Sequence, residues 1–464
     1  MNQVVSYSHY DVIVIGAGSA GIAAALGAAQ NGAHTLLLES GPFAGGELLS
    51  GLPIDGCLNA RGEWIVGGVV REILDAANKL GGYIGPVFDW RLNYGVCFDP
   101  EIIKLVIIEK LAQSKVKTWL HTFAENVVME GRKIQGIMAL NKSGRHLLTA
   151  KTYIDCSGDG DIAAMAGAPW EKGSAQGTLQ PVSLVFRMGN VDYQKYLSFM
   201  RDNPEQFTLA ENPIIDKTPA ECAAAVYEKG LPFCVLDARS TFLGNAIKSG
   251  EMYPSTGIFM WPTSLQRREV GLNSTRLAGV DATNTAALSE ALSTLSQQVG
   301  MCLSFLRNSA PGFENAHISG VAPRVGIRET RRILGEYVLT ADDVLAGKKF
   351  DDGVAKGSHH IDLHGKGTDQ ERIPVRDGKS YDIPFCSLIP QNIQNLLVAG
   401  RCFSSTREAN GSARVMGPCL SMGQAAGTAA ALMVNNSSEN VRDVSVEQLR
   451  ATLKQHGAII DGVH

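Results

Sequence analysis

The feature that most constrains the fold is a glycine-rich turn that follows directly on a short apolar run near the start of the sequence. Residues 12–15 (VIVI) are β-branched and apolar, which predicts a buried strand. Three glycines follow in the pattern G-x-G-x-x-G: Gly16, Gly18 and Gly21. The alanine-rich residues 22–33 predict a helix, and residues 34–40 (HTLLLES) predict a second strand ending on the acid Glu39. This order of elements predicts a β-α-β unit that binds a dinucleotide.

Each part of this unit has a physical role in holding a dinucleotide. Gly16 permits the tight turn, Gly18 lets the backbone approach a pyrophosphate, and Gly21 lets the helix pack close to the strand. Ser19 and Ala20 open the helix, whose N-terminus presents free N–H groups and the positive end of its dipole to the phosphates. The acid that ends the second strand is placed to accept hydrogen bonds from both ribose hydroxyls. The alternative, a glycine turn without a ligand, explains less of this context.

The size and charge of the chain limit the class of protein. Its 464 residues predict two or three domains, and its 45% hydrophobic and 19% charged residues are typical of a globular protein with a large core. The formal charge of −4 gives no indication of nucleic-acid or anionic-membrane binding. No apolar run reaches the roughly 18–20 residues that span a membrane, and no basic segment precedes the first apolar run as in a signal peptide. We therefore expect a cytoplasmic protein.

The cysteines favour isolated thiols over a cysteine-based cofactor. There are nine, an odd number, and no C-x-x-C pair occurs in the sequence. A disulfide framework, an iron–sulfur cluster and a redox dithiol are therefore not expected. We expect reduced thiols in the core of a cytosolic protein.

The rest of the chain predicts a parallel sheet interrupted by a β-meander. A glycine-rich loop over residues 41–56 follows Glu39, and helices are expected at residues 63–82 and 100–114. Residues 117–161 predict two strands, a turn at residues 130–131, a third strand, a turn at residues 143–144, and two further strands.

Beyond these strands, the sequence predicts a second unit and a return to the first. Residues 180–308 mix strands with a long helix at residues 287–308. One more strand is expected at residues 395–401, followed by a helix of small residues that begins at Met416. Small residues allow that helix to pack tightly under a ligand and to direct its N-terminus at it.

Two further segments, PRVGIRETRRILGEYVLT and NLLVAGRCFSSTREANGSARVMGPCLSMGQAAGTAAAL, complete a resemblance that covers nearly the whole chain. The chain resembles the FAD-dependent oxidoreductases of glutathione-reductase-like fold, related to the fumarate reductase and succinate dehydrogenase flavoproteins. The resemblance implies an α/β fold: a Rossmann-like FAD-binding domain, with a parallel sheet plus a β-meander, and an inserted α+β substrate domain. The implied division is 1–178 and 385–464 for FAD binding and 179–384 for the substrate or cap domain.

The resemblance also implies the residues that hold non-covalent FAD. Besides the glycine turn and Glu39, these are the pair beside the flavin, the adenine contact, the second phosphate-side motif, the ribitol contact and the start of the flavin-facing helix. In that order they are Gly45 and Gly46, Ala124, Ser157 and Gly158, Gly400 and Arg401, and Met416 and Gly417. The chain departs from the family pattern at Arg401, where many relatives carry an acid. It also lacks the second G-x-G-x-x-G of the pyridine-nucleotide disulfide reductases.

The helix that begins at Met416 has a second implied role. Its N-terminus would stabilise negative charge on the reduced flavin and so favour hydride acceptance. The alternative is that its small residues serve only a tight helix–helix contact.

Three clusters of charged residues are candidates for the substrate site. The first is Arg324, Arg328, Glu329, Arg331 and Arg332, and it could bind a substrate carboxylate or form a salt-bridge network that locks the domains. The second is His359, His360, Asp362 and His364, of which the last three share one face if the segment is a strand. The third is Arg407, Glu408, Asn410 and Arg414, which faces the cofactor or substrate or is a solvated loop.

The histidine cluster has three interpretations. A histidine there could act as acid or base near neutral pH, His360 and His364 with a carboxylate could bind a metal, or the histidines could be structural. We predict no metal.

The sequence therefore predicts an FAD-dependent oxidoreductase, a dehydrogenase or reductase that transfers a hydride between flavin N5 and a small, anionic organic substrate. Arg328 is predicted to hold a negative substrate group and His360 to move the proton. The alternatives are a flavin monooxygenase or halogenase, a flavoprotein subunit of a multi-subunit electron-transfer complex, and a non-enzymatic FAD binder. The electron acceptor or donor and the oligomeric state, including a homo-oligomer, stay open.

Overall fold

The computed structural model describes residues 4–365 and 369–462, and its largest sheet is the mixed sheet that the sequence predicts. Within the described residues this sheet has seven strands in the order β6-β2-β1-β9-β8-β7, and β21 also pairs with β9. The strands are β1 (Val4–Ile15), β2 (Thr35–Leu38), β6 (Lys117–Trp119), β7 (Phe123–Glu130), β8 (Lys133–Asn141), β9 (Gly144–Asp155) and β21 (Leu396–Val398). β6, β2, β1, β9 and β21 are parallel, whereas β7, β8 and β9 form an antiparallel meander. The predicted α/β class is confirmed.

One detail of the meander prediction is wrong. The two strands expected after the turn at residues 143–144 are a single strand, β9. It stays continuous because its middle pairs with β1, with Thr149 opposite His9 and Ala150 opposite Tyr10. Its first half also pairs with β8 and its last residues with β21, so the strand joins the meander to the parallel part of the sheet.

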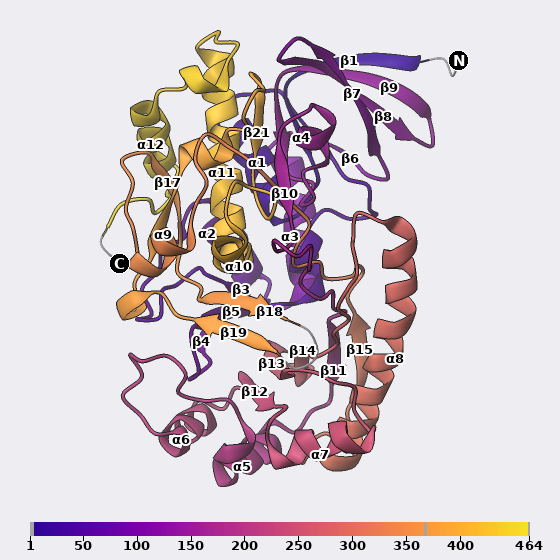
Figure 1. Ribbon diagram of the computed structural model, residues 1–464, viewed down its shortest axis with the longest axis vertical. Helices are drawn as coiled ribbons and strands as arrows, with labels where there is room; N and C mark the ends of the chain where they lie inside the picture. Colours follow the sequence, from indigo (N-terminus) through magenta and orange to yellow (C-terminus); the bar gives the residue numbers. More distant parts are fainter. Residues whose placement is uncertain (1–3, 366–368, 463–464) are drawn as a thin grey trace.

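Two helices cover one face of the sheet. α1 (Ser19–Gln30) and α11 (Met416–Asn435) lie side by side, as Figure 1 shows, and both are buried in one core with the sheet. Their contact is close because Gly423 and Gly427 of α11 face the carbonyl oxygens of Ala20 and Ala24, where a Cβ atom would overlap. The opposite face of the sheet has a second apolar core, to which α4 (Asp161–Met165) contributes.

The helices expected after the first β-α-β unit are found with different bounds. α3 (Pro100–Gln113) begins where predicted, but α2 (Val69–Lys79) begins six residues later than the expected 63–82. The later start of α2 is explained by a distant partner, because the Val69 N–H donates to the Gln424 side chain of α11 at 3.1 Å. Between the two helices lies a hairpin that the sequence analysis missed, β4 (Tyr83–Phe88) and β5 (Tyr94–Phe98), which also pairs with β3 (Ile54–Asp55).

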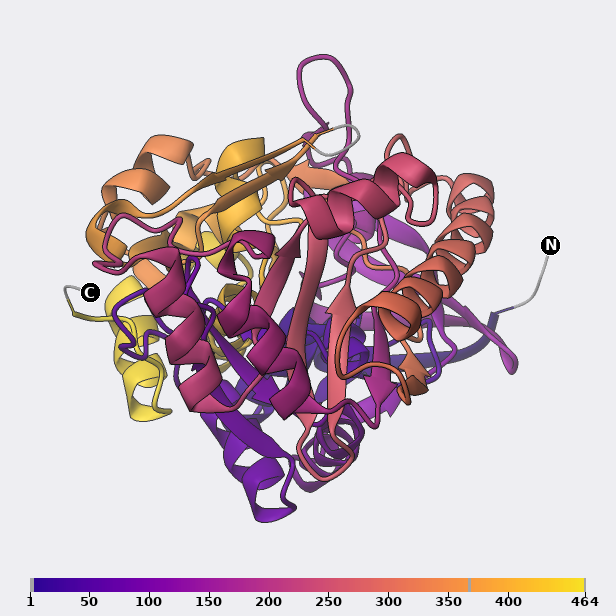
Figure 2. The ribbon, with the colours of Figure 1, turned by 90° about the horizontal axis from the view of Figure 1, so that it is seen from below.

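A second sheet with its own core forms the other end of the molecule. Its described strands have the order β12-β13-β14-β11-β15 and are antiparallel. They are β11 (Phe186–Gly189), β12 (Cys234–Asp237), β13 (Gly257–Ser264), β14 (Glu269–Asn273) and β15 (His317–Val321). The helices α5 (Tyr193–Asp202), α6 (Pro219–Lys229), α7 (Thr241–Ser249) and α8 (Thr285–Ser309) pack with it. Figures 1 and 2 show α5, α6 and α7 at the end away from the meander and the long α8 along one side.

The remaining elements lie outside these two sheets. Two-stranded pairs are formed by β10 (Trp170–Lys172) with β16 (Arg331–Ile333), β17 (Gly353–Gly357) with β20 (Tyr381–Pro384), and β18 (Ile361–His364) with β19 (Gln370–Ile373). The helices here are α9 (Ala341–Ala346), α10 (Arg407–Ala413) and α12 (Val446–Gln455). Short 3-10 helices are Gly46–Ser50, Pro204–Gln206, Arg376–Gly378, Phe385–Leu388 and Val441–Asp443.

The end of the expected second domain packs with the first. Val354, Tyr381 and Ile383, within the expected second domain 179–384, pack in the core around α1 and α11. We propose that this domain ends earlier than residue 384. Among the described helices, none is long and apolar enough to cross a membrane.

Candidate active site

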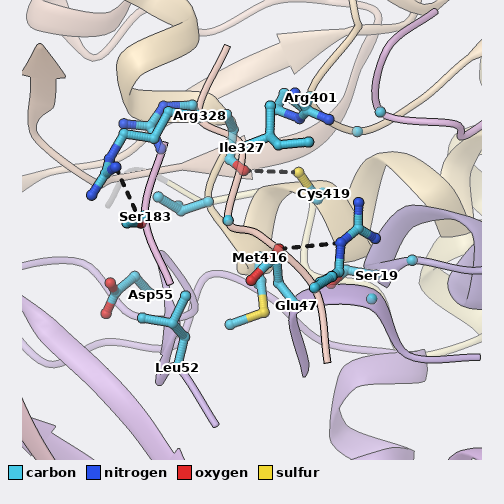
Figure 3. Close-up of a pocket in the computed structure, with 18 of the residues that line it drawn as sticks. Ser19, Glu47, Leu52, Asp55, Ser183, Ile327, Arg328, Arg401, Met416 and Cys419 are labelled. Carbon is cyan, nitrogen blue, oxygen red and sulfur yellow. Dashed lines mark hydrogen bonds and ion pairs between the residues drawn. The ribbon is translucent and has the colours of Figure 1, made fainter. Parts of the chain in front are cut away.

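One cleft collects the carboxyl ends of the parallel strands and reaches across to the second sheet. Its cavity volume is about 500 Å³. On one side it is lined by residues that follow β1, β2, β9 and β21, which is where open α/β sheets bind ligands. On the other side it is lined by β13, by the segments that follow β14 and precede β16, and by the β18–β19 hairpin. Figure 3 shows part of this lining.

The glycine turn after β1 has the shape of a phosphate cradle. Gly16 has φ +91°, and a Cβ atom there would lie 2.5 Å from the Cys156 carbonyl oxygen. A Cβ atom on Gly21 would overlap the Gly16 carbonyl, whereas one on Gly18 would meet nothing within 4 Å. No side chain caps the N-terminus of α1, so its N–H groups remain available to a ligand. The turn is therefore packed tightly on the strand side and open on the cleft side, as a pyrophosphate site requires.

Glu39 stands at the end of β2 with its carboxylate on the cleft. One oxygen accepts from the Ala17 N–H at 2.8 Å and the other from the Gly41 N–H at 2.7 Å. These bonds fix the carboxylate and leave lone pairs for the hydroxyls of a ribose. Ala124, at the start of β7, lines the same part of the cleft.

The other predicted cofactor contacts fall into two groups. Gly46, Ser157, Gly158, Gly400, Arg401 and Met416 line the cleft, together with Gly16, Gly18, Ser19 and Ala20. Gly21, Gly45 and Gly417 do not line it. Gly417 packs behind the wall, where a Cβ atom would lie 2.7 Å from the Asp55 carbonyl oxygen, and the Gly45 N–H donates to the Ala17 carbonyl at 2.8 Å. For these three glycines the structure indicates a packing role.

Arg401 has an acidic partner. It pairs with Asp159 at 2.9 Å, and both residues line the cleft. Arg401 is thus paired with an acid from the segment that follows β9. α11, which begins at Met416, has no side-chain cap, and Met416 lines the cleft, so the uncapped N-terminus of this helix lies at the cleft wall.

The first arginine cluster divides into a salt-bridge network and one separate arginine. Arg332 and Arg407 both pair with the buried Glu329, at 2.8 and 3.2 Å, and Arg331 pairs with Asp161 at 2.8 Å. Arg324 lies 3.6 Å from Glu47. Arg328 instead donates to neutral acceptors, the Pro181 carbonyl at 2.8 Å and the Ser183 hydroxyl at 3.2 Å. The salt-bridge interpretation therefore describes Arg331 and Arg332, whereas substrate binding by Arg328 stays a prediction.

The second cluster forms a chain of hydrogen bonds at the cleft wall. Arg276 donates to Nδ1 of His364 at 2.7 Å, so the ring proton of His364 is on Nε2, which donates to Asp362 at 2.9 Å. Gln370 donates to the other Asp362 oxygen at 2.6 Å, and Arg414 lies 3.5 Å from the carboxylate. Burial lowers the pKa of His364 to about 4, and the pKa of Asp362 lies well below its usual range despite burial because His364, His360 and Arg414 favour the charged form. The pair is therefore a neutral imidazole and a carboxylate.

His359 and His360 form a stacked pair beside this chain. Their ring centroids are 3.9 Å apart, and Nδ1 of His359 donates to the His360 carbonyl at 2.8 Å. Nδ1 of His360 is buried without a hydrogen-bond partner. Burial lowers the pKa of His359 to about 4 and that of His360 well below its usual range, so both rings are neutral at neutral pH. No group of three or more side chains that could hold a metal ion occurs among the described residues.

The third cluster is not a loop. Its first three residues lie in α10, and Arg414 follows directly. Arg414 lines the cleft, whereas Glu408 and Asn410 do not, and Asn410 donates to the Arg401 carbonyl at 2.9 Å. α10 forms because Thr406 caps its N-terminus by accepting from the Ala409 N–H.

Several cleft residues were not singled out from the sequence: Glu47, Asp55, Arg91, Asp159 and Arg276. Glu47 and Asp55 both lie in the glycine-rich loop expected beside the cofactor, and a charged residue in such a loop was the available signal. Burial raises the pKa of Glu47, although Arg324 and Arg401 oppose this effect. Arg91 and Arg276 belong to segments with no motif.

Short local matches link the chain to two curated proteins. It is 48% identical over 73 residues to sarcosine oxidase subunit alpha of Corynebacterium sp. (strain U-96), which covers 15% of this chain and 7% of that protein. It is 58% identical over 40 residues to vinyl phenol reductase of Lactiplantibacillus plantarum (strain ATCC BAA-793 / NCIMB 8826 / WCFS1), which covers 9% of this chain and 8% of that protein. The chain thus matches only a small part of the length of either relative.

Longer matches come from the structural and family comparisons. A geranylgeranyl bacteriochlorophyll reductase-like protein from Thermoplasma acidophilum aligns over 97% of this chain and 84% of its own, with 12% identity and a TM-score of 0.45. The family model described as FAD dependent oxidoreductase matches residues 11–453. That span includes the glycine cradle, Glu39 and the arginine-lined wall of the cleft, and the cradle fits the diphosphate of the family's cofactor. The chain therefore belongs to the FAD dependent oxidoreductase family and is an enzyme whose cofactor is FAD.

Proposed function

We propose that this enzyme is a dehydrogenase or reductase that transfers a hydride between flavin N5 and a small, anionic organic substrate. The observation that carries the proposal is the bonding of Arg328 in the cleft. Its guanidinium contacts only neutral acceptors, Pro181 O and Ser183 Oγ, and no carboxylate of the described residues lies within ion-pair distance. A half-buried cation without an anionic partner in the protein favours the binding of an anionic ligand beside it.

The surroundings of Arg328 strengthen this argument. Burial, with Arg414 nearby, lowers the pKa of Arg328 to about 10, so it remains a cation at neutral pH. Arg276, buried on the same wall, also bonds only to neutral groups, namely His364 and the carbonyls of Gly365 and Asp369. Neither arginine has a carboxylate within ion-pair distance, although the charge of Asp362 acts on both, and this supports an anionic ligand in this part of the cleft.

The remaining roles follow from the places of the side chains. Bound FAD supplies the two-electron acceptor or donor. The glycine turn and the α1 N-terminus would hold its diphosphate, Glu39 its ribose, and the α11 N-terminus at Met416 would stabilise negative charge on the ring system. His360 is neutral here, so it would offer the substrate a hydrogen bond.

The family relation, the direction of the reaction and the cellular location are part of the same proposal. We infer a relation to the fumarate reductase and succinate dehydrogenase flavoproteins from the motifs, and the local match to a protein named vinyl phenol reductase supports testing the reductive direction. A cytoplasmic location is supported by the nine free cysteines.

The test is anaerobic and uses the flavin as its own indicator. Oxidised enzyme is mixed with small 2-hydroxy and 2-amino carboxylates, and dithionite-reduced enzyme with α,β-unsaturated carboxylates, while the flavin absorbance is followed. We expect one of these carboxylates to bleach or restore the flavin band. Arg328→Gln should lower kcat/KM by about 100-fold with unchanged FAD content, because it removes a buried charged contact. Arg307→Gln, an exposed arginine of α8, is the matched control.

Three outcomes would contradict the proposal. Neutral amides or esters that react as fast as the acids would remove the anionic substrate class. Oxygen-dependent NAD(P)H consumption with a C4a-peroxyflavin would favour a monooxygenase or halogenase. Co-purification with an iron–sulfur subunit, without turnover of free substrates, would favour a subunit of an electron-transfer complex.

A further inference from the structure

One carboxyl group of the cleft differs from every other acid described above. Asp55 ends β3, where it pairs with Gly95 of β5, and its side chain lines the cleft. Its carbonyl oxygen abuts Gly417 in the first turn of α11, so the residue sits where this helix meets the cleft. Figure 3 shows Asp55 beside Leu52, below Ser183 and Arg328 in the view.

The carboxyl group of Asp55 has no protein partner. Its Oδ1 is buried without a hydrogen bond, and across the described residues neither oxygen forms a hydrogen bond or an ion pair. Asp89, a nearby acid, is bonded by the N–H groups of Arg91, Leu92 and Asn93 and by the Arg91 side chain. A buried carboxyl that its own chain leaves unbonded is costly, and such groups call for a ligand or a catalytic role.

The electrostatic surroundings hold a proton on Asp55. Burial, followed by repulsion from Asp89 and Asp362, raises its pKa to about 8, and Arg91 only partly opposes this. The charged and titratable groups that face it are Asp89 and Arg91 from the β4–β5 loop, Asp362 of β18, Cys97 of β5 and Cys57 on its own segment. Burial raises the pKa of both thiols far above neutral pH, so they stay uncharged. Asp55 is thus a group that can both give and take a proton near neutral pH.

The other candidates in the cleft are less suited to this task. His359, His360 and His364 have lowered pKa values, so they carry no second proton to give at neutral pH and accept one poorly. Asp362 is ionised and already accepts hydrogen bonds from His364 and Gln370.

We propose that Asp55 is the catalytic residue that exchanges the substrate proton, a step that rests on the proposed hydride-transfer function. In oxidation, bound FAD would accept the hydride that a substrate carbon loses when its C–H bond breaks. The adjacent O–H or N–H bond breaks and its proton goes to the Asp55 carboxylate, and a C=O or C=N bond forms. In reduction, hydride adds to one carbon of the double bond, and the Asp55 carboxyl gives its proton to the other.

The first test needs no substrate. Infrared spectra of the FAD-loaded enzyme are recorded from pH 5 to 10 for wild type and for Asp55→Asn, which keeps the size of the side chain. We expect wild type to show a protonated-carboxyl band that disappears with a midpoint near pH 8, and Asp55→Asn to lack it. The exposed Asp75 of α2, changed to Asn, is the matched control and should leave that band in place. A wild-type spectrum without an Asp55-dependent band would overturn the proposal.

The second test follows the reductive or oxidative half-reaction with the carboxylate panel above. Asp55→Asn should slow the step by about 100-fold or more with unchanged FAD content, and the ionisation near pH 8 should vanish from its rate profile. Asp55→Ala provides a second variant, in which added formate should restore part of the rate. A rate for Asp55→Asn within threefold of wild type would overturn the proposal.

The two tests separate this proposal from the one on which it rests. If no carboxylate in the panel reacts with wild type, the anionic substrate class fails, while the infrared titration still decides whether Asp55 holds an exchangeable proton. If the panel reacts and the infrared band is absent, the substrate class stands and the role of Asp55 is refuted.

Discussion

The two halves of the cleft are built from different parts of the chain. The half that we propose to bind FAD, here the cofactor half, consists mostly of backbone: the glycine turn after β1, the uncapped starts of α1 and α11, and the ends of parallel strands. The half that we propose to bind substrate, here the substrate half, consists of charged side chains from separate segments, among them Asp55, Arg276, Arg328 and Asp362. The cofactor half depends on where strands end, whereas the substrate half depends on which distant side chains meet.

The two kinds of wall respond differently to changes in sequence. Backbone donors at strand ends come with the fold itself and tolerate changes in neighbouring side chains. A site made of side chains changes when single residues change, so its chemistry must be read from the particular residues present. If the halves are joined rigidly and act separately, a variant in one half should leave the properties of the other half unchanged.

The largest effect is expected at the joint between the halves. Glu269 of β14 is 1% exposed in its side chain and pairs with Arg187 and Arg267, each at 3.1 Å. Arg187 also pairs with Glu101 of α3 at 2.7 Å and so links the second sheet to the cofactor half. Glu269→Ala removes the buried carboxylate that the two arginines share and leaves Arg187 with Glu101 and Arg267 with Asp99. It should therefore lower the free energy of unfolding by about 2 kcal/mol, the size of a lost hydrogen-bonded charge. Urea unfolding of the FAD-loaded enzyme measures this loss.

The control and the pH dependence of this joint sharpen the result. Glu314→Ala removes an exposed ion pair with Lys195 and should cost less than about 1 kcal/mol. Despite burial, hydrogen bonds and charge from Arg267 and Arg187 lower the pKa of Glu269 to about 2 from its ordinary 4.5. Its stabilisation is therefore complete above pH 4.5 and is lost as the pH falls toward 2. In Glu269→Gln the free energy of unfolding should fall less between pH 4.5 and pH 2 than in wild type. An equal fall in both proteins would show that the charge of Glu269 does not stabilise the contact between the halves.

A smaller effect is expected from a methyl group in the cofactor half. Gly18 has φ −74°, which alanine adopts without strain, and a Cβ atom there meets no protein atom within 4 Å. Gly18→Ala should therefore leave the stability of the FAD-free protein within about 1 kcal/mol, yet weaken FAD binding at least about tenfold, because the methyl group occupies the space for the diphosphate. Calorimetric titration of the FAD-free protein gives the dissociation constant.

Gly300 provides the matched control for this variant. It lies within α8, and a Cβ atom there also meets nothing within 4 Å. Gly300→Ala should leave FAD affinity unchanged and raise stability by up to about 1 kcal/mol through helix propensity. Equal FAD affinity in Gly18→Ala and wild type would place the diphosphate elsewhere.

The same contrast explains what the sequence could predict. Residues 12–15 of β1, the glycine turn, Glu39 and the start of α11 were predicted, because each depends on neighbouring residues and on strict spacing. The first part of β1, from Val4, was missed because it pairs with β9, which lies far away in the sequence. The start of α2 was wrong because Gln424, far away in the sequence, fixes it, and β9 was split because its pairing with β1 is not visible locally. Asp55 and Arg276 were missed because their significance lies in partners that they lack or that come from other elements.

The smallest effect is expected at the N-terminus of α8. A variant there tests whether the two halves act separately. Asn284 caps this helix by accepting from the N–H groups of Ala286 and Ala287 at 3.1 and 3.2 Å. Asn284→Ala should cost about 1 kcal/mol in unfolding free energy. The same helix also positions Arg276, which lines the cleft. The Gln298 side chain accepts a hydrogen bond from the Arg276 N–H at 2.7 Å and donates one to the Arg276 carbonyl at 3.0 Å.

Whether loss of the Asn284 cap affects the cleft depends on how far the helix unwinds from its N-terminus. Asn284 and Gln298 are 14 residues apart, about 21 Å of helix, and lost capping disturbs mainly the first turn. We therefore expect Asn284→Ala to keep wild-type FAD affinity and kcat/KM, while Gln298→Ala lowers kcat/KM by releasing Arg276 and leaves FAD affinity unchanged. Steady-state kinetics and flavin titration of the two variants decide the point. A loss of FAD affinity in Gln298→Ala would show that the side-chain half supports the backbone half, and the two could no longer be treated as independent.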